Sequence, residues 1–459
     1  MLIFLSHPDI DTGGSIGVNR EEIYRIVETE NVKFIRLQFT DILGVFKSIS
    51  ITTDQLGKAL DGELMFDGSS IEGFVRIEES DMYLHPDPDT FLVLPWTSPN
   101  SPSKTARLIC DVFDPNGNPF EGCPRHALAR VLAEAHAMGY SMQVGPEPEF
   151  FLFQVNEDGT PSLKTHDKAS YFDLPPVDRG EEARRDMVET LQSIGFEIEA
   201  SHHEGAPGQH EIDFKYMEAL KTADNIMTFR IVVRTVAQRH GLHATFMPKP
   251  VFGINGSGMH MHISLFEGDK NAFNDPDQED GLSDTCRHFI AGILKHAPAI
   301  SAITSPTVNS YKRLVPGYEA PVYIAWSHRN RSPLIRIPAK RGMSTRLEVR
   351  SPDPSCNPYL GMTVLLKAGL EGIRHKMEPP TPIGKNIYEM DLASRIEQGI
   401  RSLPENLLEA VKELRKDTLI QDALGQHIFS RFVKAKTTEW ESYSSRVYDW
   451  EVNEYLEKF

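Results

Sequence analysis

Cysteine is scarce in this chain, and basic residues are fewer than acidic ones. The 459 residues include four cysteines, none in a C-x-x-C pair, which fits a reducing compartment better than a disulfide framework. Lys and Arg total 48 against 65 Asp and Glu, so the net charge is −17. This acidic excess argues against nucleic acid or an anionic membrane as a whole-surface partner, but it does not forbid a local basic pocket.

The chain also lacks long apolar runs and the usual glycine motifs for nucleotides. The opening MLIFLSHPDI contains one short apolar run with no basic region before it, too short for a signal peptide or a membrane span. We therefore expect a soluble, cytoplasmic protein. A Walker lysine loop and a G-x-G-x-x-G motif after a strand are both missing, so any nucleotide must bind in another way.

Length and pattern predict a leader and two domains. We expect a flexible leader at residues 1–16, an N-terminal domain at 17–118, and a larger domain at 119–459 that ends in a helical segment. The boundary is the turn DPNGNPF (114–120), which precedes a helix opening at Pro124. With 40% hydrophobic residues, a chain of this length can bury a large core.

The hydrophobic periodicity predicts an α+β fold. The N-terminal part should contain a helix capped by Asn19 and a hairpin around Gly44. Strands are expected at 142–154, 196–201, 259–266 and 345–350, and helices at 179–194, 217–241, 282–297 and beyond 357. Helices and strands are interspersed without a regular βαβ rhythm, which favours α+β over a doubly wound sheet.

The segment GPEPEFFLF raises the main chemical question, because it places Glu147 and Glu149 in an otherwise apolar stretch. Residues i and i+2 of a strand face the same way, and a buried carboxylate is costly unless something pairs with it. The two acids could instead lie on an exposed strand face. For this segment alone, the two interpretations are about equally supported.

Similar segments elsewhere favour a shared metal site. HHEGAPGQHEI carries Glu204 and Glu211 beside a Gly-Pro-Gly loop. NGSGMHMHISL and STRLEVRSPD turn further groups to one strand face, namely His260, His262, Arg346, Glu348 and Arg350. A set of five glutamates and a histidine suits Mg²⁺ or Mn²⁺ better than zinc, and its charge suggests two or more cations.

An arginine cluster follows in the chain. The segment from Tyr311 to Pro338 carries Arg313, Arg329, Arg331 and Arg336. Guanidinium groups bind carboxylate and phosphate in a bidentate fork. Metals held by acids beside such a cluster are suited to phosphoryl transfer, although a basic surface stripe is the simpler alternative.

Together these segments resemble class I glutamine synthetase. The resemblance rests on MFDGSSIEGF, GPEPEFFLF, HHEGAPGQHEI, KPVFGINGSGMHMHISL, LVPGYEAPVYIAWS, NRSPLIRIP and RLEVRSPDPSCNPYL, in the family's order, from about Val32 to the end of the chain. It implies an N-terminal β-grasp domain and a catalytic domain with a curved antiparallel sheet flanked by helices. It also implies nitrogen assimilation in two steps, in which ATP phosphorylates glutamate and ammonia then displaces phosphate.

The resemblance also implies roles for individual residues. One cation, near glutamate and ammonia, would be held by Glu149, Glu204 and Glu211. The other, bridging the phosphates of ATP, would be held by Glu147, His260 and Glu348. ATP would further contact Glu199, His262, Ser264, Arg336 and Arg346. Glutamate would contact Asn255, Gly256, Arg313, Arg331 and Arg350.

The remaining implied roles concern ammonium, the lid and regulation. Ammonium would bind Asp67, Ser70 and Tyr171, with Asp67 also accepting its proton. Glu319 would close over the site and exclude water, and Arg331 would lie near the transferred phosphoryl group. Arg76 would take part in feedback inhibition by glutamine, as in the shorter branch of the family. We expect no adenylylation at Tyr388, because its context departs from the regulated branch.

The family resemblance further implies a dodecamer of two stacked hexameric rings. Active sites would lie between subunits, so that Asp67 serves the neighbouring subunit's metals, and the aromatic C-terminal segment would dock into the opposing ring. Its simpler alternative is an ordinary last helix. Regulatory protein partners are compatible with the sequence, which does not identify the effectors.

Two other functions compete with glutamine synthesis. A related ligase that joins glutamate to a larger amine should alter the ammonium-site residues, yet Asp67, Ser70 and Tyr171 are all present. An inactive relative serving as a structural or nitrogen-sensing protein should have lost metal ligands, yet all six are present. The sequence therefore favours glutamine synthesis.

Overall fold

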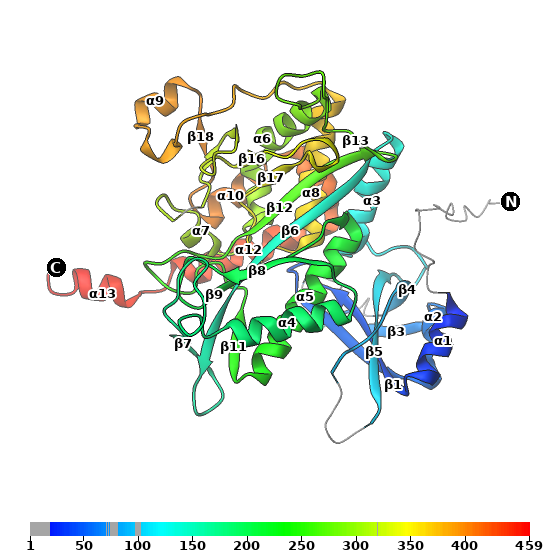
Figure 1. Ribbon diagram of the computed structural model, residues 1–459. Coiled ribbons are helices and arrows are strands. Elements are labelled where there is room, and N and C mark those ends of the chain that lie inside the picture. Colours follow the sequence, from blue (N-terminus) through cyan, green and yellow to red (C-terminus); the bar gives the residue numbers. More distant parts are fainter. Residues whose placement is uncertain (1–18, 70, 72, 74–80, 97–101, 319) are drawn as a thin grey trace.

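The computed structural model describes residues 19–69, 71, 73, 81–96, 102–318 and 320–459 (Figure 1). The predicted leader, Ser70, Arg76 and Glu319 lie outside these described residues. Within the described ranges, no helix is both long and apolar enough to cross a membrane.

The N-terminal part is a five-stranded sheet with two helices. The strand order is β2 (Phe46–Thr52), β1 (Val32–Thr40), β5 (Lys104–Phe113), β4 (Asp81–Val93) and β3 (Leu64–Asp67). Strands β1 and β5 are parallel, whereas the other neighbours are antiparallel. The accompanying helices are α1 (Arg20–Thr29) and α2 (Leu56–Leu60).

The local predictions for this part are confirmed. The Asn19 side chain accepts a hydrogen bond from the Glu22 amide and so caps α1. Gly44 has φ +83° between β1 and β2, and an added Cβ there would lie 3.1 Å from the Asn357 Cα. The hairpin therefore needs glycine both for its backbone conformation and for its contact with the second domain.

A larger sheet forms the second part of the molecule. Its main path is β15 (Trp326–His328), β16 (Ile335–Ile337), β17 (Leu347–Val349), β12 (Met259–Glu267), β6 (Ser141–Val155), β9 (Gln209–Phe214) and β8 (Ile198–His203). Only β15 and β16 pair in parallel along this path. The short strands β7 (Pro161–Thr165), β10 (Met217–Glu218), β11 (Leu242–Thr245) and β13 (Lys270–Asn271) pair with β6 or β12. The α+β class is thus confirmed.

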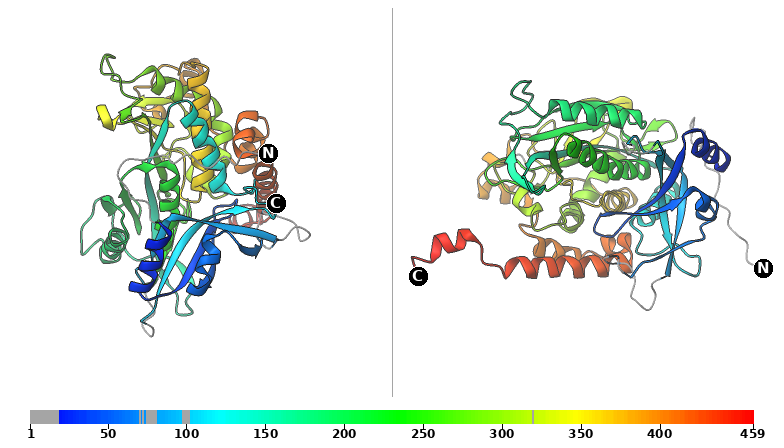
Figure 2. Two further views of the ribbon diagram at one scale, coloured as in Figure 1. Left: turned by 90° about the vertical axis from the view of Figure 1, so that its right-hand side faces the viewer. Right: turned by 90° about the horizontal axis from the view of Figure 1, so that it is seen from below.

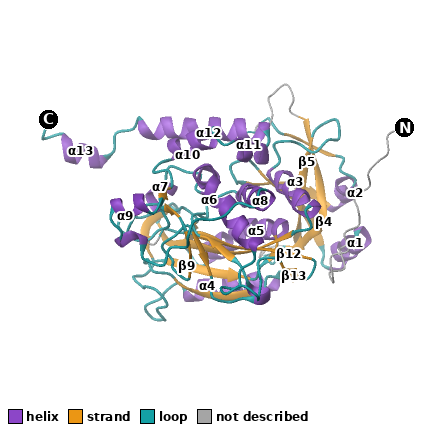
Figure 3. Cartoon of the chain, turned by 90° about the horizontal axis from the view of Figure 1, so that it is seen from above, coloured by secondary structure: helices purple, strands orange, loops and turns teal. Residues whose placement is uncertain are grey.

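Helices cover one face of this sheet in layers (Figure 3). The nearer layer contains α3 (Pro124–Ala137), α5 (Ala219–Arg239), α6 (Asp284–Thr304) and α8 (Pro358–Arg374). Farther out lie α10 (Leu407–Leu414), α11 (Thr418–Leu424) and α12 (Gln426–Ser444). Other elements are α4 (Glu181–Ser193), α7 (Ser310–Arg313), β14 (Tyr323–Ile324), α9 (Leu392–Glu397) and β18 (Arg401–Ser402).

One helical prediction needs correction. Helix α6 does not end near Ala297 but runs through Pro298 to Thr304, because its last turn, including Ile300 and Ile303, is buried in the core. Burial there offsets the lost backbone hydrogen bond of proline. The C-terminal segment is two helices, α12 and α13 (Asp449–Tyr455), and α13 extends away from the body of the molecule (Figure 2).

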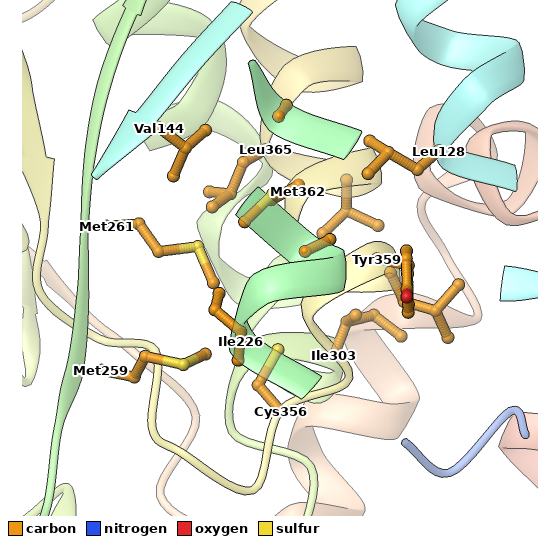
Figure 4. Packing of buried hydrophobic residues seen from close by; sticks show 14 of the residues in the cluster. Leu128, Val144, Ile226, Met259, Met261, Ile303, Cys356, Tyr359, Met362 and Leu365 are labelled. Atoms are coloured by element: carbon orange, nitrogen blue, oxygen red, sulfur yellow. The ribbon is translucent and has the colours of Figure 1, made fainter. Parts of the chain in front are cut away.

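The core lies between the sheet and the first helix layer (Figure 4). Met259 and Met261 of β12 are fully buried there, facing residues such as Ile226 of α5 and Met362 of α8. Because strand side chains alternate, the intervening residues of β12 face the opposite side of the sheet. That opposite side carries the polar residues of the candidate site.

A buried ion network joins the two parts of the molecule. Arg125 of α3 donates to Asp87 of β4 at 2.6 Å, to Asp111 of β5 at 2.7 Å and to Asp224 of α5 at 3.1 Å. The Tyr359 hydroxyl of α8 donates to the same Asp224 at 2.6 Å. Although burial opposes it, the surrounding carboxylates hold the pKa of Arg125 well above its usual value.

We predict that Arg125→Leu destabilises the protein by about 3–5 kcal/mol, because it leaves buried carboxylates without a counter-charge. Urea denaturation followed by circular dichroism measures the shift. Arg20→Leu is the control, since it breaks an exposed ion pair with Asp61 and should change the midpoint little. Equal midpoints for the two variants would contradict the stabilising role of the network.

Candidate active site

The candidate site occupies the sheet face opposite the helix layer. Strand pairing places His260 directly across from Glu147, His262 across from Glu348, and Glu149 across from Glu211. Directly opposite residues of an antiparallel pair have Cβ atoms about 5 Å apart. Four adjacent strands therefore bring acids and histidines that are distant in sequence onto one surface.

The first cluster consists of Glu147, His260 and Glu348, whose ligand atoms all lie within 4.8 Å of one another. His260 Nδ1 is 3.1 Å from Glu147 Oε2, and His262 Nε2 is 2.6 Å from Glu147 Oε1. Although burial opposes it, His262 and His260 hold the pKa of Glu147 well below its usual value. Burial and then Arg350 lower the pKa of His260 to about 4, so its imidazole is neutral and can act as a ligand.

Arginines surround this first cluster. Arg350 donates to Glu348 Oε1 at 2.5 Å, and Arg336 Nε contacts Glu348 Oε2. Arg346 Nε donates to His262 Nδ1 at 3.1 Å, which fixes the proton of that imidazole on Nε2, facing Glu147. Arg346, Glu348 and Arg350 thus point to the same face, as the i, i+2, i+4 spacing predicts.

The second cluster contains a residue that sequence analysis did not select. The structure groups Glu204 and Glu211 with His202, within 4.8 Å of one another. His202 Nε2 lies 3.1 Å from Glu211 Oε1, and its Nδ1 lies 3.5 Å from Glu204 Oε1. The signal was present in HHEGAPGQHEI, since His202 and Glu204 are two residues apart.

Glu149 lies beside the second cluster and shares its electrostatic field. Burial raises the pKa of Glu149 well above its usual value, and repulsion from Glu204 and Glu211 raises it further. Burial and nearby acids likewise raise the pKa of Glu211, and that of Asp213 to about 7. Ionisation of all these carboxylates at once is unfavourable unless a cation neutralises their negative charge. Carboxylate oxygens with one or two imidazoles match the ligand preferences of Mg²⁺ and Mn²⁺.

A third group of possible ligands has a different character. His166, Asp167, Asp178 and His210 are all buried, with ligand atoms within 4.8 Å of one another. Arg184 lies 2.9 Å from Asp178 Oδ2 and 2.9 Å from His210 Nδ1. The guanidinium already neutralises the carboxylate and would repel a metal ion. This group is therefore a structural hub.

The hub forms a hydrogen bond with the loop between Glu204 and Glu211. Asp167 Oδ1 accepts a hydrogen bond from the Gly208 amide at 2.9 Å and lies 3.3 Å from His203 Nε2. A hydrogen bond between a buried carboxylate and a backbone amide restricts the geometry of the loop that carries the amide. The second cluster thus rests on a fixed loop.

A cavity of about 220 Å³ adjoins the first cluster. Four of the predicted ATP residues line it, together with Glu147, namely Glu199, His262, Ser264 and Arg346. The fifth, Arg336, is instead paired with Glu348. Sequence analysis did not select Lys340, Asp213 or Tyr216, which also line the cavity. The signal for Asp213 was present, because it lies two residues after Glu211 on β9.

Two of the predicted glutamate residues, Arg313 and Gly256, lie close to Glu149. A Cβ at Gly258 would contact both Arg313 and Glu149, and Gly256 shares a hydrogen-bond donor with Glu149. Arg313 is buried and donates to the carbonyls of Ser351 at 2.8 Å and Arg350 at 3.1 Å, which leaves further N–H groups on its guanidinium. A Cβ at Gly256 would lie 2.3 Å from the Pro248 carbonyl, and one at Gly258 would lie 2.7 Å from Arg313. The loop after Asn255 therefore approaches its neighbours as only glycine can.

Of the predicted ammonium residues, the structure describes Asp67 and Tyr171, and it places them on separate parts of the chain. Asp67 ends β3, an edge strand of the N-terminal sheet, whereas Tyr171 lies near the second cluster, with its ring 5.5 Å from that of His202 (Figure 1). Two hydrogen bonds from Ser69, at 2.6 and 2.8 Å, lower the pKa of the exposed Asp67 carboxyl. Tyr171 interacts with the Arg331 guanidinium.

The loop before Glu319 is tied to its surroundings. Tyr318 presents its ring face to Lys249 Nζ at 3.7 Å, and the Tyr388 hydroxyl donates to the Ala320 carbonyl at 2.6 Å. The tyrosine considered for adenylylation is thus engaged within the chain. Its lack of modification stays a prediction.

Comparisons with known proteins agree on one family. The model of the glutamine synthetase β-grasp domain matches residues 31–115, and that of the glutamine synthetase catalytic domain matches residues 121–455. A glutamine synthetase of Clostridium saccharobutylicum is 58% identical over 440 residues, which cover 96% of this chain and 99% of the relative. One from Staphylococcus aureus strain N315 is 56% identical over 441 residues, covering 96% and 98%.

Solved structures share the fold over nearly the whole chain. A GmaS–ADP complex has a TM-score of 0.86 at 34% identity, covering 95% of this chain and 99% of that one. The cryo-EM structure of Plasmodium falciparum glutamine synthetase has a TM-score of 0.84 at 25% identity, covering 95% and 98%. The β-grasp domain and the curved catalytic sheet implied by the sequence motifs are confirmed. The chain therefore belongs to the glutamine synthetase family, and its length fits the shorter branch of class I.

Proposed function

We propose that this protein catalyses ATP-dependent amidation of L-glutamate by ammonia and that its two carboxylate–histidine clusters hold the divalent cations of the reaction. The observation that carries the proposal is that the first cluster adjoins a cavity and that buried arginines, among them Arg350 and Arg313, lie beside the clusters. Membership of the family and the 56–58% identity to glutamine synthetases support the activity.

The residues around the first cluster would act on ATP. Glu147, His260 and Glu348 would hold one Mg²⁺ or Mn²⁺ ion, and Glu199, His262, Ser264, Arg336 and Arg346 would contact the nucleotide. Arg346 supports this role because it lines the cavity and orients His262. Bound cations would neutralise charge on the phosphates, since phosphoryl transfer depends mainly on charge neutralisation and positioning.

The residues around the second cluster would act on glutamate. Glu149, Glu204 and Glu211 would hold the second cation, assisted by His202, whose ring nitrogens face Glu204 and Glu211. Arg313 and Arg350 would hold the glutamate carboxylate, Asn255 and Gly256 would contact its other end, and Arg331 would neutralise the transferred phosphoryl group. Glu319, on the loop after Tyr318, would exclude water from the acyl phosphate.

Ammonium must lose a proton before its nitrogen can attack. We assign that task to Asp67, with Ser70 and Tyr171 lining the same site. The low pKa of Asp67 keeps it ionised and able to bind ammonium. Because Asp67 and Tyr171 lie on separate parts of one chain, the assignment needs Asp67 from a neighbouring subunit.

We further propose a homo-oligomer, with two hexameric rings as its form. The exposed apolar residues of the projecting C-terminal helix, including Trp450 and Leu456, support docking on another subunit. The domain division at 17–118 and 119–459, feedback inhibition by glutamine through Arg76 and a cytoplasmic location are part of the same proposal. The four cysteines are buried and form no disulfide, which is compatible with a cytoplasmic location.

We predict that the purified protein, given Mg²⁺, ATP and glutamate, releases phosphate rapidly with ammonium and much more slowly with methylamine, ethylamine or putrescine. We expect this preference because all three residues that the family resemblance assigns to ammonium, Asp67, Ser70 and Tyr171, are present. A colorimetric phosphate assay paired with glutamine quantification measures the rates. Preference for a larger amine would identify the amine-ligase alternative, and no turnover would favour the inactive-relative alternative.

We also predict that divalent cations stabilise the protein more at pH 8 than at pH 6. The raised pKa values of Glu149, Glu211 and Asp213 mean that the folded, cation-free protein keeps protons that the unfolded chain releases above about pH 4. Its stability therefore falls as pH rises from about 4 through about 7, where Asp213 titrates. Cations replace the lost protons.

Differential scanning fluorimetry with EDTA or Mn²⁺ at the two pH values measures the effect. Asp213→Asn is the matched control, because it removes one of the titrating groups and should reduce the pH dependence of the EDTA sample. Equal stabilisation by Mn²⁺ at both pH values would contradict the claim that repulsion among these carboxylates is relieved by protons at low pH and by cations at high pH.

A further inference from the structure

Gln209 is a fully buried glutamine at the start of β9, two residues before Glu211, with 1% of its surface exposed. None of the roles above involves it. Its side chain nevertheless reaches three segments of the site, which are the strand of Glu149, the loop of Gly256 and the loop after Glu204.

The contacts of Gln209 use its whole amide group. Nε2 donates to Glu149 Oε2 at 2.7 Å and to the Gly256 carbonyl at 3.1 Å. Its Oε1 accepts from the Ala206 amide at 3.2 Å. A primary amide has two N–H donors, so both are committed, one to the Glu149 carboxylate and one to the Gly256 carbonyl.

These contacts determine which oxygen of Glu149 is available. Oε2 also accepts a hydrogen bond from the Gly258 amide at 3.0 Å, so two donors engage it. Among the described residues, no hydrogen bond reaches Oε1. A carboxylate held in this way turns one oxygen toward the protein and offers the other to a cation.

The bond to Gly256 extends the effect to the predicted glutamate loop. The backbone at Gly256 packs closely against the Pro248 carbonyl, and a Cβ added to Gly256 would clash with that oxygen. The Gln209 side-chain amide holds the Gly256 carbonyl in position by a direct hydrogen bond. One side chain thus fixes a predicted cation ligand and a predicted substrate loop.

We propose that Gln209 is a positioning residue that orients Glu149 for the second cation and couples that cation to glutamate binding through Gly256. The proposal rests on the proposed function for the identity of the substrate. A residue that merely fills space would need only the volume of glutamine, whereas this role needs its two N–H donors.

The test compares Gln209→Met with wild type in the full-length protein. Methionine has a similar volume but no donors. Titration of Mn²⁺, followed by electron paramagnetic resonance of the free ion, should show one class of sites weakened about 10-fold and the other class unchanged. The KM for glutamate should rise by a similar factor, whereas the KM for ATP should not change.

Gln154→Met is the matched control. Gln154 lies on β6, where it pairs with β11, and its exposed amide donates to the Thr165 carbonyl at 3.3 Å. This variant should match wild type in both measurements. If Gln209→Met does not fold, Gln209→Glu keeps the shape of the side chain, cannot make both hydrogen bonds to Glu149 and Gly256, and should still raise the KM for glutamate.

Two outcomes overturn the proposal. One is unchanged Mn²⁺ binding and an unchanged glutamate KM in Gln209→Met. The other is a parallel loss at both Mn²⁺ classes and for both substrates, which would indicate a general structural role. If wild type makes no glutamine, the proposed function fails, but the Mn²⁺ titration still tests whether Gln209 orients Glu149.

Discussion

The main constraint on this structure is the electrostatic repulsion among carboxylates that the sheet places on one surface. Glu149, Glu204 and Glu211 share a partly buried site, and burial together with their mutual repulsion raises the pKa of Glu149. No rearrangement of a single side chain removes this conflict, because the acids come from different strands. A cation resolves it, and the glycine loops, buried arginines and supporting histidines are arranged around that requirement.

Because side chains alternate along a strand, the same strands supply both this surface and the core. In β12, Met259 and Met261 enter the core, whereas His260 and His262 face Glu147. A shift of one residue would bury the histidines and expose the methionines. The apolar core therefore fixes the register on which the cation clusters depend, and Arg125 links that core region to the N-terminal sheet.

Much of this arrangement follows from local sequence pattern. The Asn19 cap, the hairpin at Gly44 and the strands β6 and β12 are predicted because each depends on neighbours a few residues away. The period of two also places Glu147, His260 and Glu348 each on one strand face, but their grouping into one cluster was implied by the family resemblance and depends on the register of three strands. The continuation of α6 past Pro298 does not follow from local pattern, since burial against distant helices overrides the local signal.

Other features depend on contacts that one sequence does not reveal. His202 joins Glu211 only because β8 and β9 pair in one register, and Gln209 reaches Glu149 across another strand boundary. The buried hub of Asp167, Asp178 and His210 resembles a metal site by residue type, yet Arg184 makes it a self-neutralised network. Residue type alone therefore does not separate a cation site from a structural one.

Anomalous X-ray diffraction from crystals soaked in Mn²⁺ tests the central claim most directly. The account predicts two peaks per chain, one among Glu147, His260 and Glu348 and one among Glu149, Glu204 and Glu211. Absence of anomalous density at both clusters, or density only in the hub around Asp167, would contradict it.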